Sequence, residues 1–298
     1  MGVIGVAPHF HVTPTWLDDD TVMFESRGIV EYGSGWYVED VDSIGFVTLN
    51  VVTGEARFLR QGYTQPRSLL KDGTAVVTRA GYWGTLAIVD RNGGITPIME
   101  PGQWFLRTYV GMDRSRRWLV WRNNGSDHDY GLWLLDLEEK EYRYAGRGFR
   151  PDWNPAGGVF AYVVNGTNPV RNDNYIVTFD PVSGIRDTIR EHHEMDGGPL
   201  AVAYAPDGES LAVCYRWRDP NAAGIYIFTP STGEIRQVGH RDTDEMSWGP
   251  RGIVYGDQSG EFEDEFGGVI WFLDPGTGVE RPLTHRLQHF AAADPDTS

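Results

Sequence analysis

The sequence predicts an all-β fold, a six-bladed β-propeller with four antiparallel strands in each blade. Three observations lead to it. One turn motif recurs six times, a second turn motif precedes each copy of the first, and no stretch of useful length has the periodicity of an amphipathic helix. Four short strands cannot bury both faces of their sheet alone, so such units are expected to stack face to face around an axis.

The first motif is an apolar strand, an Asx or Pro turn with glycine near its end, and a second strand. Its Asp column falls 40, 46, 44, 49 and 45 residues apart in successive copies, which marks an internal repeat. The glycine supplies the positive φ of a tight hairpin, and the Asp or Asn side chain can cap the turn. The copies are FVTLNVVTGEARFL (46–59), LAIVDRNGGITPIM (86–99), LWLLDLEEKEYRY (132–144), IVTFDPVSGIRDTI (176–189), YIFTPSTGEIRQV (226–238) and WFLDPGTGVERPLT (271–284).

The second motif leads from an aromatic or apolar residue through a Pro, Asp or Gly turn into another β-rich run. Each unit therefore contains two hairpins, which gives the four strands of one blade. The copies are TWLDDDTVMF (15–24), SLLKDGTAVV (68–77), YVGMDRSRRWLVW (109–121), DWNPAGGVFAYV (152–163), AYAPDGESLAV (203–213) and SWGPRGIVY (247–255).

The pairing of a W-x-P-D-G-like turn with a D-P-x-T-G-like turn resembles the TolB-like, or WD40-like, propeller repeats. The resemblance covers roughly residues 12–284 and implies the propeller architecture. Trp153–Gly158, Tyr204–Gly208 and Trp248–Gly252 carry the first of these turns, and Asp180–Gly184 and Asp274–Gly278 carry the second. The third copy departs from the pattern, because the turns that follow Asp113 and Asp136 contain no glycine.

The whole chain is expected to form one domain. Its six blades are placed at about 12–60, 61–100, 101–145, 146–191, 192–239 and 240–284, with 285–298 as a tail. Two ways of closing the ring stay open at this point. The last unit contains its own outer strand, Val279 to Leu283, so blade 6 can pack directly on blade 1, or residues 1–10 can add a strand where the two blades meet.

The charge balance limits the class of partner. The chain has 42 acidic and 26 basic residues, a net charge of −16, which repels polyanions. Nucleic acid and anionic membranes are therefore not expected as partners, and no apolar stretch is long enough to span a bilayer. The N-terminus lacks a signal peptide's basic region, which favours a cytoplasmic or virion location without fixing the compartment. The only cysteine, Cys214, lies in an apolar run and is expected to be buried.

The loop-rich rim is the predicted site of function. We use this name for the rim that carries the links from second to third strand and from one blade to the next, which are the long links here. Aromatic and arginine side chains gather in them and suit a protein partner or a glycan by stacking and bidentate contacts; the alternative is that the aromatics pack between blades. The candidate binding residues are Trp36, Tyr37, Tyr63, Tyr82, Trp83, Trp104, Arg107, Arg150, Arg216 and Trp217.

No metal or cofactor is expected, although one group of residues calls for a metal test. His192, His240 and Asp242 lie in consecutive links between blades and have the ligand types that divalent ions use. No H-E-x-x-H spacing, nucleophile elbow or phosphate-binding loop accompanies them, and loop histidines are commonly solvated.

Three functions are compatible with these features. The first is a non-catalytic interaction or structural module, a subunit of a larger assembly such as a viral tail or a surface complex. The second is implied by the family resemblance: a lyase or hydrolase, metal-assisted in some members, whose Arg107, Arg150 and Arg216 would neutralise the carboxylates of an acidic polysaccharide. The third is a propeller detached from a multidomain protease. We favour the first, because no constellation for bond making is evident.

Overall fold

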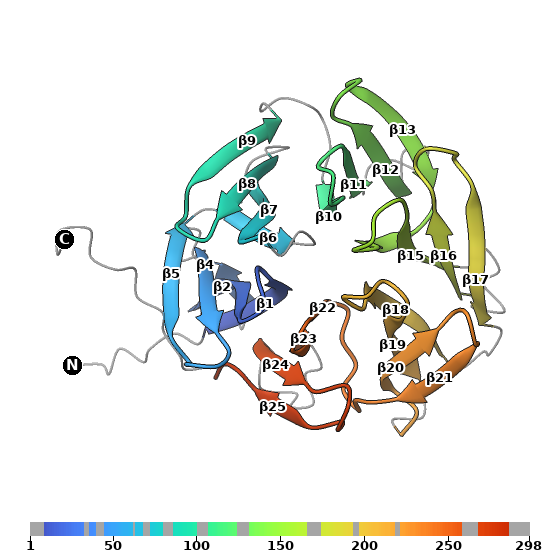
Figure 1. Ribbon diagram of the computed structural model, residues 1–298. Helices are drawn as coiled ribbons and strands as arrows, with labels where there is room; N and C mark the ends of the chain where they lie inside the picture. Colours follow the sequence, from blue (N-terminus) through green and yellow to red (C-terminus); the bar gives the residue numbers. More distant parts are fainter. Residues whose placement is uncertain are drawn as a thin grey trace, which may run out of the picture.

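The computed structural model is a ring of six antiparallel sheets around a central axis, which confirms the predicted all-β, six-bladed propeller (Figure 1). It describes residues 9–32, 36–39, 45–61, 63–67, 72–79, 86–99, 107–123, 131–165, 174–192, 197–217, 221–257 and 268–285. All regular secondary structure in these ranges is β-strand, and none of them contains a helix that could cross a membrane.

Each blade is built from strands that follow one another in the chain, with the first strand nearest the axis. Blade 1 consists of β1 (His9–Trp16), β2 (Thr21–Tyr32), β3 (Trp36–Glu39), β4 (Gly45–Asn50) and β5 (Ala56–Gln61). Blade 2 consists of β6 (Tyr63–Arg67), β7 (Thr74–Arg79), β8 (Leu86–Asp90) and β9 (Ile95–Met99). Blade 3 consists of β10 (Arg107–Met112), β11 (Trp118–Asn123), β12 (Gly131–Asp136) and β13 (Glu141–Gly146).

The remaining three blades have four strands each. Blade 4 consists of β14 (Phe149–Trp153), β15 (Phe160–Asn165), β16 (Asn174–Phe179) and β17 (Arg186–His192). Blade 5 consists of β18 (Gly197–Tyr204), β19 (Leu211–Trp217), β20 (Gly224–Thr229) and β21 (Glu234–Gln237). Blade 6 consists of β22 (Met246–Gly249), β23 (Gly252–Asp257), β24 (Val269–Leu273) and β25 (Glu280–Pro282).

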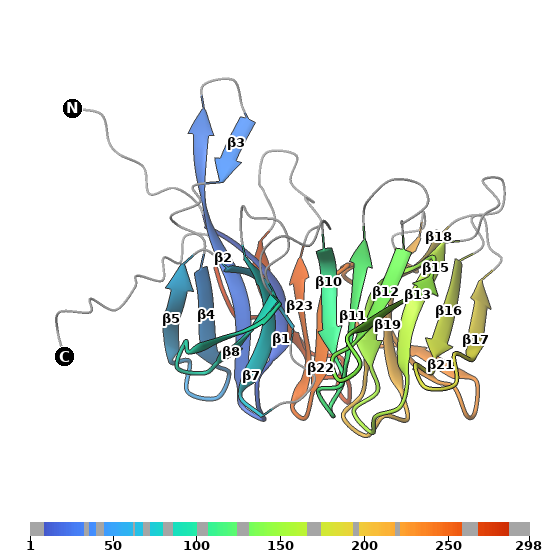
Figure 2. The same cartoon turned by 90° about the horizontal axis from the view of Figure 1, so that it is seen from above.

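The repeated turns form as the sequence predicts, and they lie together on one rim, which we call the turn rim (Figure 2). In the turn between the third and fourth strands, the Asp or Asn side chain accepts hydrogen bonds from the backbone N–H groups that follow it. Asp180 Oδ1 accepts from Val182 N at 2.7 Å, and Asn50 Oδ1 accepts from Thr53 N at 2.9 Å. These caps satisfy donors that the sheet leaves unpaired, so the turn is specified locally.

In blade 3, the third copies of both turn motifs adopt the same turns without glycine. Arg116 has a φ of 61° and Lys140 a φ of 59°, in the left-handed region that glycine occupies in other copies, for example Gly184 at 74°. A side chain with a Cβ atom is disfavoured there. Blade 3 therefore carries local backbone strain that most other blades avoid.

Apolar side chains from neighbouring blades form the core. Val22 and Leu49 of blade 1 pack with Ile270 of blade 6 in one cluster, and corresponding clusters fill the spaces between the other blades. Trp16 and Trp153, the aromatic residues of the second motif, are fully buried at these joints. The stability of the ring therefore comes mainly from burial between blades.

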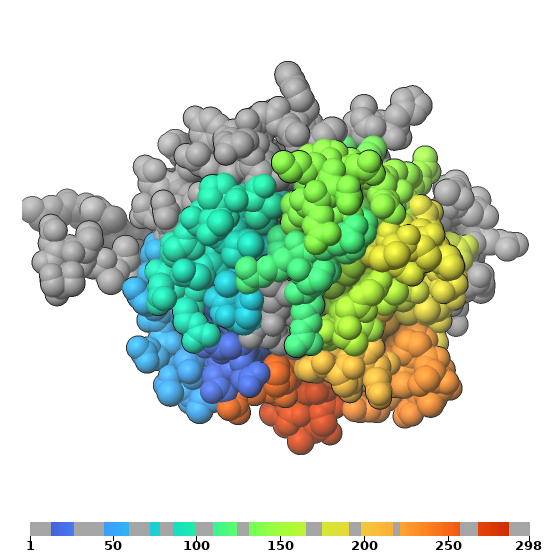
Figure 3. All heavy atoms as spheres, turned by 45° about the horizontal axis from the view of Figure 1, so that its top comes forward, coloured from blue at the N-terminus to red at the C-terminus, as the bar shows by residue number. Residues whose placement is uncertain are grey.

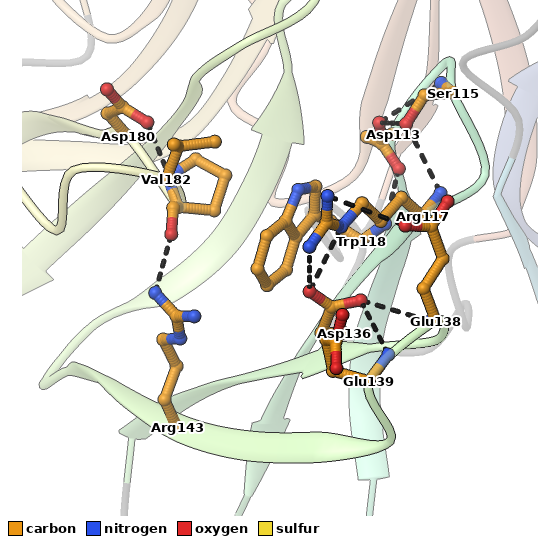
Figure 4. A network of polar contacts seen from close by, with 11 residues as sticks. Asp113, Ser115, Arg117, Trp118, Asp136, Glu138, Glu139, Arg143, Asp180 and Val182 are labelled. Atoms are coloured by element: carbon orange, nitrogen blue, oxygen red, sulfur yellow. Dashed lines mark hydrogen bonds and ion pairs between the residues drawn. The ribbon is translucent and has the colours of Figure 1, made fainter.

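A network of polar contacts orders the turn rim of blade 3 (Figure 4). Arg117 donates to Asp136 Oδ2 from Nε at 3.0 Å and from Nη2 at 2.7 Å, and this bonding lowers the pKa of the Asp136 carboxyl below its usual value. The guanidinium groups of Arg117 and Arg143 lie over the Trp118 ring, 5.1 and 5.0 Å from its centroid. Arg143 also donates from Nη1 to the carbonyl oxygen of Pro181 in blade 4, at 2.6 Å.

The same arginine contact recurs at two other joints. Arg236 of blade 5 donates to Pro275 O of blade 6 at 3.0 Å, and Arg281 of blade 6 donates to Val51 O of blade 1 at 3.3 Å. Each of these arginines lies seven residues after the Asp column of its own copy of the first motif. The repeat therefore encodes a link to the next blade as well as a turn.

Within the described residues, the ring closes by packing of blade 6 on blade 1, and no strand is exchanged between these two blades. Blade 6 has its own outer strand, β25, and His9 and Phe10 belong to β1, the inner strand of blade 1. Trp16 Nε1 donates to Gly252 O at 3.1 Å across the joint, and Arg251 pairs with Asp20. Residues 1–8 and 286–298 lie outside the described residues, as does any strand or tail that the sequence suggested there.

Several strands extend into segments that the sequence assigned to links. Residues 27–43, the long link expected between the second and third strands of blade 1, contain the C-terminal half of β2 and all of β3. Strand β3 pairs only with β2 among the described strands and projects beyond the ring (Figure 2). Tyr63, Arg150 and Arg216 likewise lie in strands rather than in links. Pairing with a neighbouring strand satisfies backbone groups in these segments, and the turn motifs carry no signal for it.

Candidate functional site

The predicted binding residues divide into those that the structure describes and those that it does not. Arg150 and Arg216 have described side chains, in β14 and β19. Trp36, Tyr37, Tyr63, Arg107 and Trp217 have described backbone positions in β3, β6, β10 and β19, but their side chains lie outside the description. Tyr82, Trp83 and Trp104 lie wholly outside the described residues. The site is therefore built from the first group.

Arg150 forms an ion pair that connects blade 4 with the segment leading into blade 6, on the other side of blade 5. It lies in β14, the inner strand of blade 4, and its Nη2 donates to Asp244 Oδ2 in the segment leading into blade 6. Its backbone φ of 55° falls where β14 shifts register against β15, and its side chain is only 10% exposed. A bulge of this kind redirects a side chain, here from one blade to the next but one.

Arg216 forms a second ion pair beside the first. Its Nε donates to Asp242 Oδ2 at 2.9 Å, and the arginine side chain is 63% exposed while that of Asp242 is 20% exposed. We call Arg150, Arg216, Asp242 and Asp244 the axial charge cluster. Two arginines meet two aspartates, so the formal charges within the cluster balance.

The segment that carries the two aspartates is held in place by buried contacts. Thr243 N donates to Cys214 Sγ at 3.0 Å, and Thr243 Oγ1 lies 2.6 Å from Gly256 O, to which it donates. Burial raises the pKa of the Cys214 thiol to about 12, so this sulfur acts as a structural acceptor and not as a nucleophile.

Glu245 extends the polar contacts to the joint between the last and first blades. Its Oε2 accepts a hydrogen bond from Thr13 N at 2.7 Å, and both residues are buried. Sequence reasoning missed Glu245. The available signal was its position, three residues before Trp248, the aromatic residue of the last copy of the second motif. The matching positions in the first and fourth copies hold Thr13 and Arg150, which also take part in these polar contacts.

The metal candidates are not brought together in the described part of the chain. His240 Nδ1 lies 3.2 Å from Gln237 Nε2, and Asp242 is bonded to Arg216. His192 ends β17, and its side chain lies outside the description. Within the described residues, no group of three or more His, Cys, Asp and Glu side chains could hold a metal ion.

No protein-family model matches the chain, and no sequence among the curated proteins is significantly similar to it. Similar solved structures include TolB from Acinetobacter baumannii, 10% identical over 92% of this chain and 79% of that one, with a TM-score of 0.64. An oligogalacturonate lyase in complex with manganese is 13% identical over 93% of this chain and 77% of that one, with a TM-score of 0.58.

A chain of the nidogen/laminin complex is 11% identical over 92% of this chain and 91% of that one, with a TM-score of 0.56. Identities this low show a shared fold and nothing more. They confirm that this chain has a TolB-like β-propeller fold, the architecture that its turn motifs predicted.

Proposed function

We propose that this chain is a non-catalytic interaction module that binds a protein partner through its loop-rich rim, as a subunit of a larger assembly such as a viral tail or a surface complex. The observation that carries the proposal is the axial charge cluster. Arg150 and Arg216 are two of the three arginines that an enzyme for acidic glycans would use to neutralise substrate carboxylates, and both are paired with aspartates. A uronate would have to displace Asp244 from a side chain that is nine-tenths buried.

A protein partner suits this arrangement better. The exposed guanidinium of Arg216 and the less exposed carboxylate of Asp242 offer a donor and an acceptor side by side. Such a pair can exchange partners with a charged residue of another protein at little cost, because an exposed ion pair contributes only about 0–1 kcal/mol. A similar propeller fold occurs in a protein–protein complex, that of nidogen with laminin.

The test has two arms. In the first, the tagged chain is isolated from its native source, the co-purifying protein is identified, and the complex is reconstituted from purified components. We expect one partner at fixed stoichiometry. Binding should weaken in Arg216→Glu but not in Asp207→Arg, which changes an exposed charge on the turn rim of blade 5.

The second arm tests the competing enzyme hypothesis, which the fold of the oligogalacturonate lyase favours. The purified chain is incubated with oligogalacturonate, with and without added manganese, and unsaturated product is followed by ultraviolet absorbance. We expect none to form. Product formation that is lost in Arg150→Ala would replace the proposal with the lyase.

A further inference from the structure

A hairpin of blade 1 projects beyond the ring at the loop-rich rim (Figure 2). It consists of the C-terminal part of β2 and all of β3, with Ile29 opposite Glu39 at its base. Strand β1 pairs with β2 only as far as Gly28, and β4 pairs with β2 only as far as Ser26. Beyond these residues, the two strands of the hairpin pair only with each other among the described strands.

The edge of β3 that faces away from β2, which we call the outer edge of β3, is suited to pairing with a further strand. A two-stranded hairpin is only marginally stable in water, and the backbone groups along a strand edge can pair with another chain. Positions 29–39 hold six β-branched or aromatic residues, which favour the extended conformation. Partner proteins bind such edges by adding an extended segment as the next strand.

One face of the hairpin is apolar. Successive residues of a strand alternate between its two faces, and residues directly opposite each other on neighbouring strands share a face. The pairs Val30 with Val38 and Tyr32 with Trp36 therefore occupy one face, and all four positions are apolar or aromatic. The same alternation puts them in line with Phe24 of β2, which packs in the apolar cluster shared with blade 6.

The opposite face is acidic. It holds the pairs Ile29 with Glu39 and Glu31 with Tyr37, and positions 29–39 contain no lysine or arginine. This face continues the alternate positions of β2 that include Met23, which packs in the apolar cluster shared with blade 2. Blade 1 (blue) lies between blade 2 (teal) and blade 6 (orange to red) on the surface (Figure 3). The apolar and acidic faces therefore belong to opposite sides of blade 1.

We propose that the outer edge of β3 binds an extended segment of the partner protein in which lysine or arginine alternates with apolar residues. This inference rests on the proposed function and specifies the chemistry of the partner. A strand added beside β3 places its basic residues on the face of Glu39 and its apolar residues on the face of Trp36 and Val38. Opposite charges on neighbouring strands stabilise a sheet and like charges destabilise it. A second copy of this chain, with a net charge of −16, is therefore disfavoured as the occupant.

The probe is a fluorescein-labelled peptide of seven residues in which lysine and valine alternate. Its binding to the full chain is followed by fluorescence anisotropy at about 150 mM salt, where long-range attraction is largely screened. We expect saturable binding, and at least about tenfold weaker binding of the matched peptide with glutamate in place of lysine.

Two N-methylated peptides test whether the backbone pairs. A strand donates hydrogen bonds to one neighbour through every second N–H group. We therefore expect N-methylation of either all the lysines or all the valines to abolish binding, while the other set of methyl groups is tolerated. General attraction to an acidic protein would treat both peptides alike, and that result would overturn the proposal.

Charge variants test the acidic face. Glu31→Gln with Glu39→Gln should weaken binding of the lysine–valine peptide by at least about threefold. Glu209→Gln with Glu234→Gln removes the same charge from exposed positions of blade 5 and should change the dissociation constant by less than about twofold. Equal weakening by the two pairs would contradict a site at the hairpin.

Removal of the hairpin completes the test. Replacing residues 29–39 with Gly-Ser-Gly-Ser retains the pairing of β2 with β1 and β4, so the ring is expected to fold, which calorimetry can check. This variant should lose saturable binding of the peptide, and unchanged binding would overturn the proposal. The peptide experiments do not require the native partner. A native partner that bound the shortened chain as tightly as the parent would overturn this inference and leave the proposed function standing.

Discussion

Replacing Lys140 with glycine should stabilise the protein. Lys140 has a φ of 59°, and the matching positions Gly54, Gly184, Gly233 and Gly278 have φ values of 71–75°. The left-handed conformation costs a residue with a Cβ atom about 1–2 kcal/mol. Glycine loses about 0.5–1 kcal/mol more backbone entropy on folding, so the free energy of unfolding should rise by about 0.5–1 kcal/mol. For a chain of this length, Tm should rise by about 1–2 °C, which differential scanning calorimetry can resolve.

Two matched variants isolate the backbone effect. Lys140→Ala removes the same exposed side chain but keeps a Cβ atom, so it should give none of this stabilisation. Gly184→Lys places the reverse change in blade 4, where a Cβ would meet no atom within 4 Å, and should destabilise by a similar amount. If alanine at position 140 stabilised the protein as much as glycine does, relief of left-handed strain could not be the cause.

Three further predictions concern other parts of the ring. Asp136→Asn should lower the free energy of unfolding by about 2 kcal/mol at pH 7, because Arg117 loses its charged acceptor while remaining partly solvated. The pKa of Asp136 is lowered in the folded protein, so its stabilisation is complete above about pH 4 and disappears as the pH falls through the lowered pKa; urea titrations should therefore show the variant and the parent converging at low pH. Trp16→Phe should cost about 2 kcal/mol in the same assay by leaving Gly252 O without its donor, and an unchanged urea midpoint would contradict the role given to this bond in closing the ring. With a pKa of about 12, the Cys214 thiol is ionised in only about one molecule in 10,000 at pH 8, so it should resist Ellman's reagent until the chain is unfolded.

The fold could be predicted from sequence because its determinants are local and repeated. A capping side chain such as Asp180 and a glycine four residues later specify each turn within a few residues, and the spacing of the turns sets the number of blades. The third copy kept its turns after losing both glycines, since packing against neighbouring blades offsets the strain at Arg116 and Lys140. Strand β3 could not be predicted, because its pairing with β2 depends on partners that no turn motif announces.

The candidate site was predictable only in part. Arg150 and Arg216 could be identified from residue type and position, but Asp244 could not, and Asp242 was predicted only as a candidate metal ligand. Arg150 and Asp244 are 94 residues apart and belong to different blades, so only the ring brings them together.

The joint between blade 6 and blade 1 should determine the order in which the blades unfold. Among the described strands, no backbone pairing crosses this joint, and side-chain contacts and one apolar cluster hold blades 6 and 1 together. Every other pair of adjacent blades is also connected through the peptide chain. Unfolding should therefore start at this joint and proceed from the two terminal blades, 1 and 6, towards blades 3 and 4. Amide exchange would record that order, with the protons of the two terminal blades released before those of blades 3 and 4.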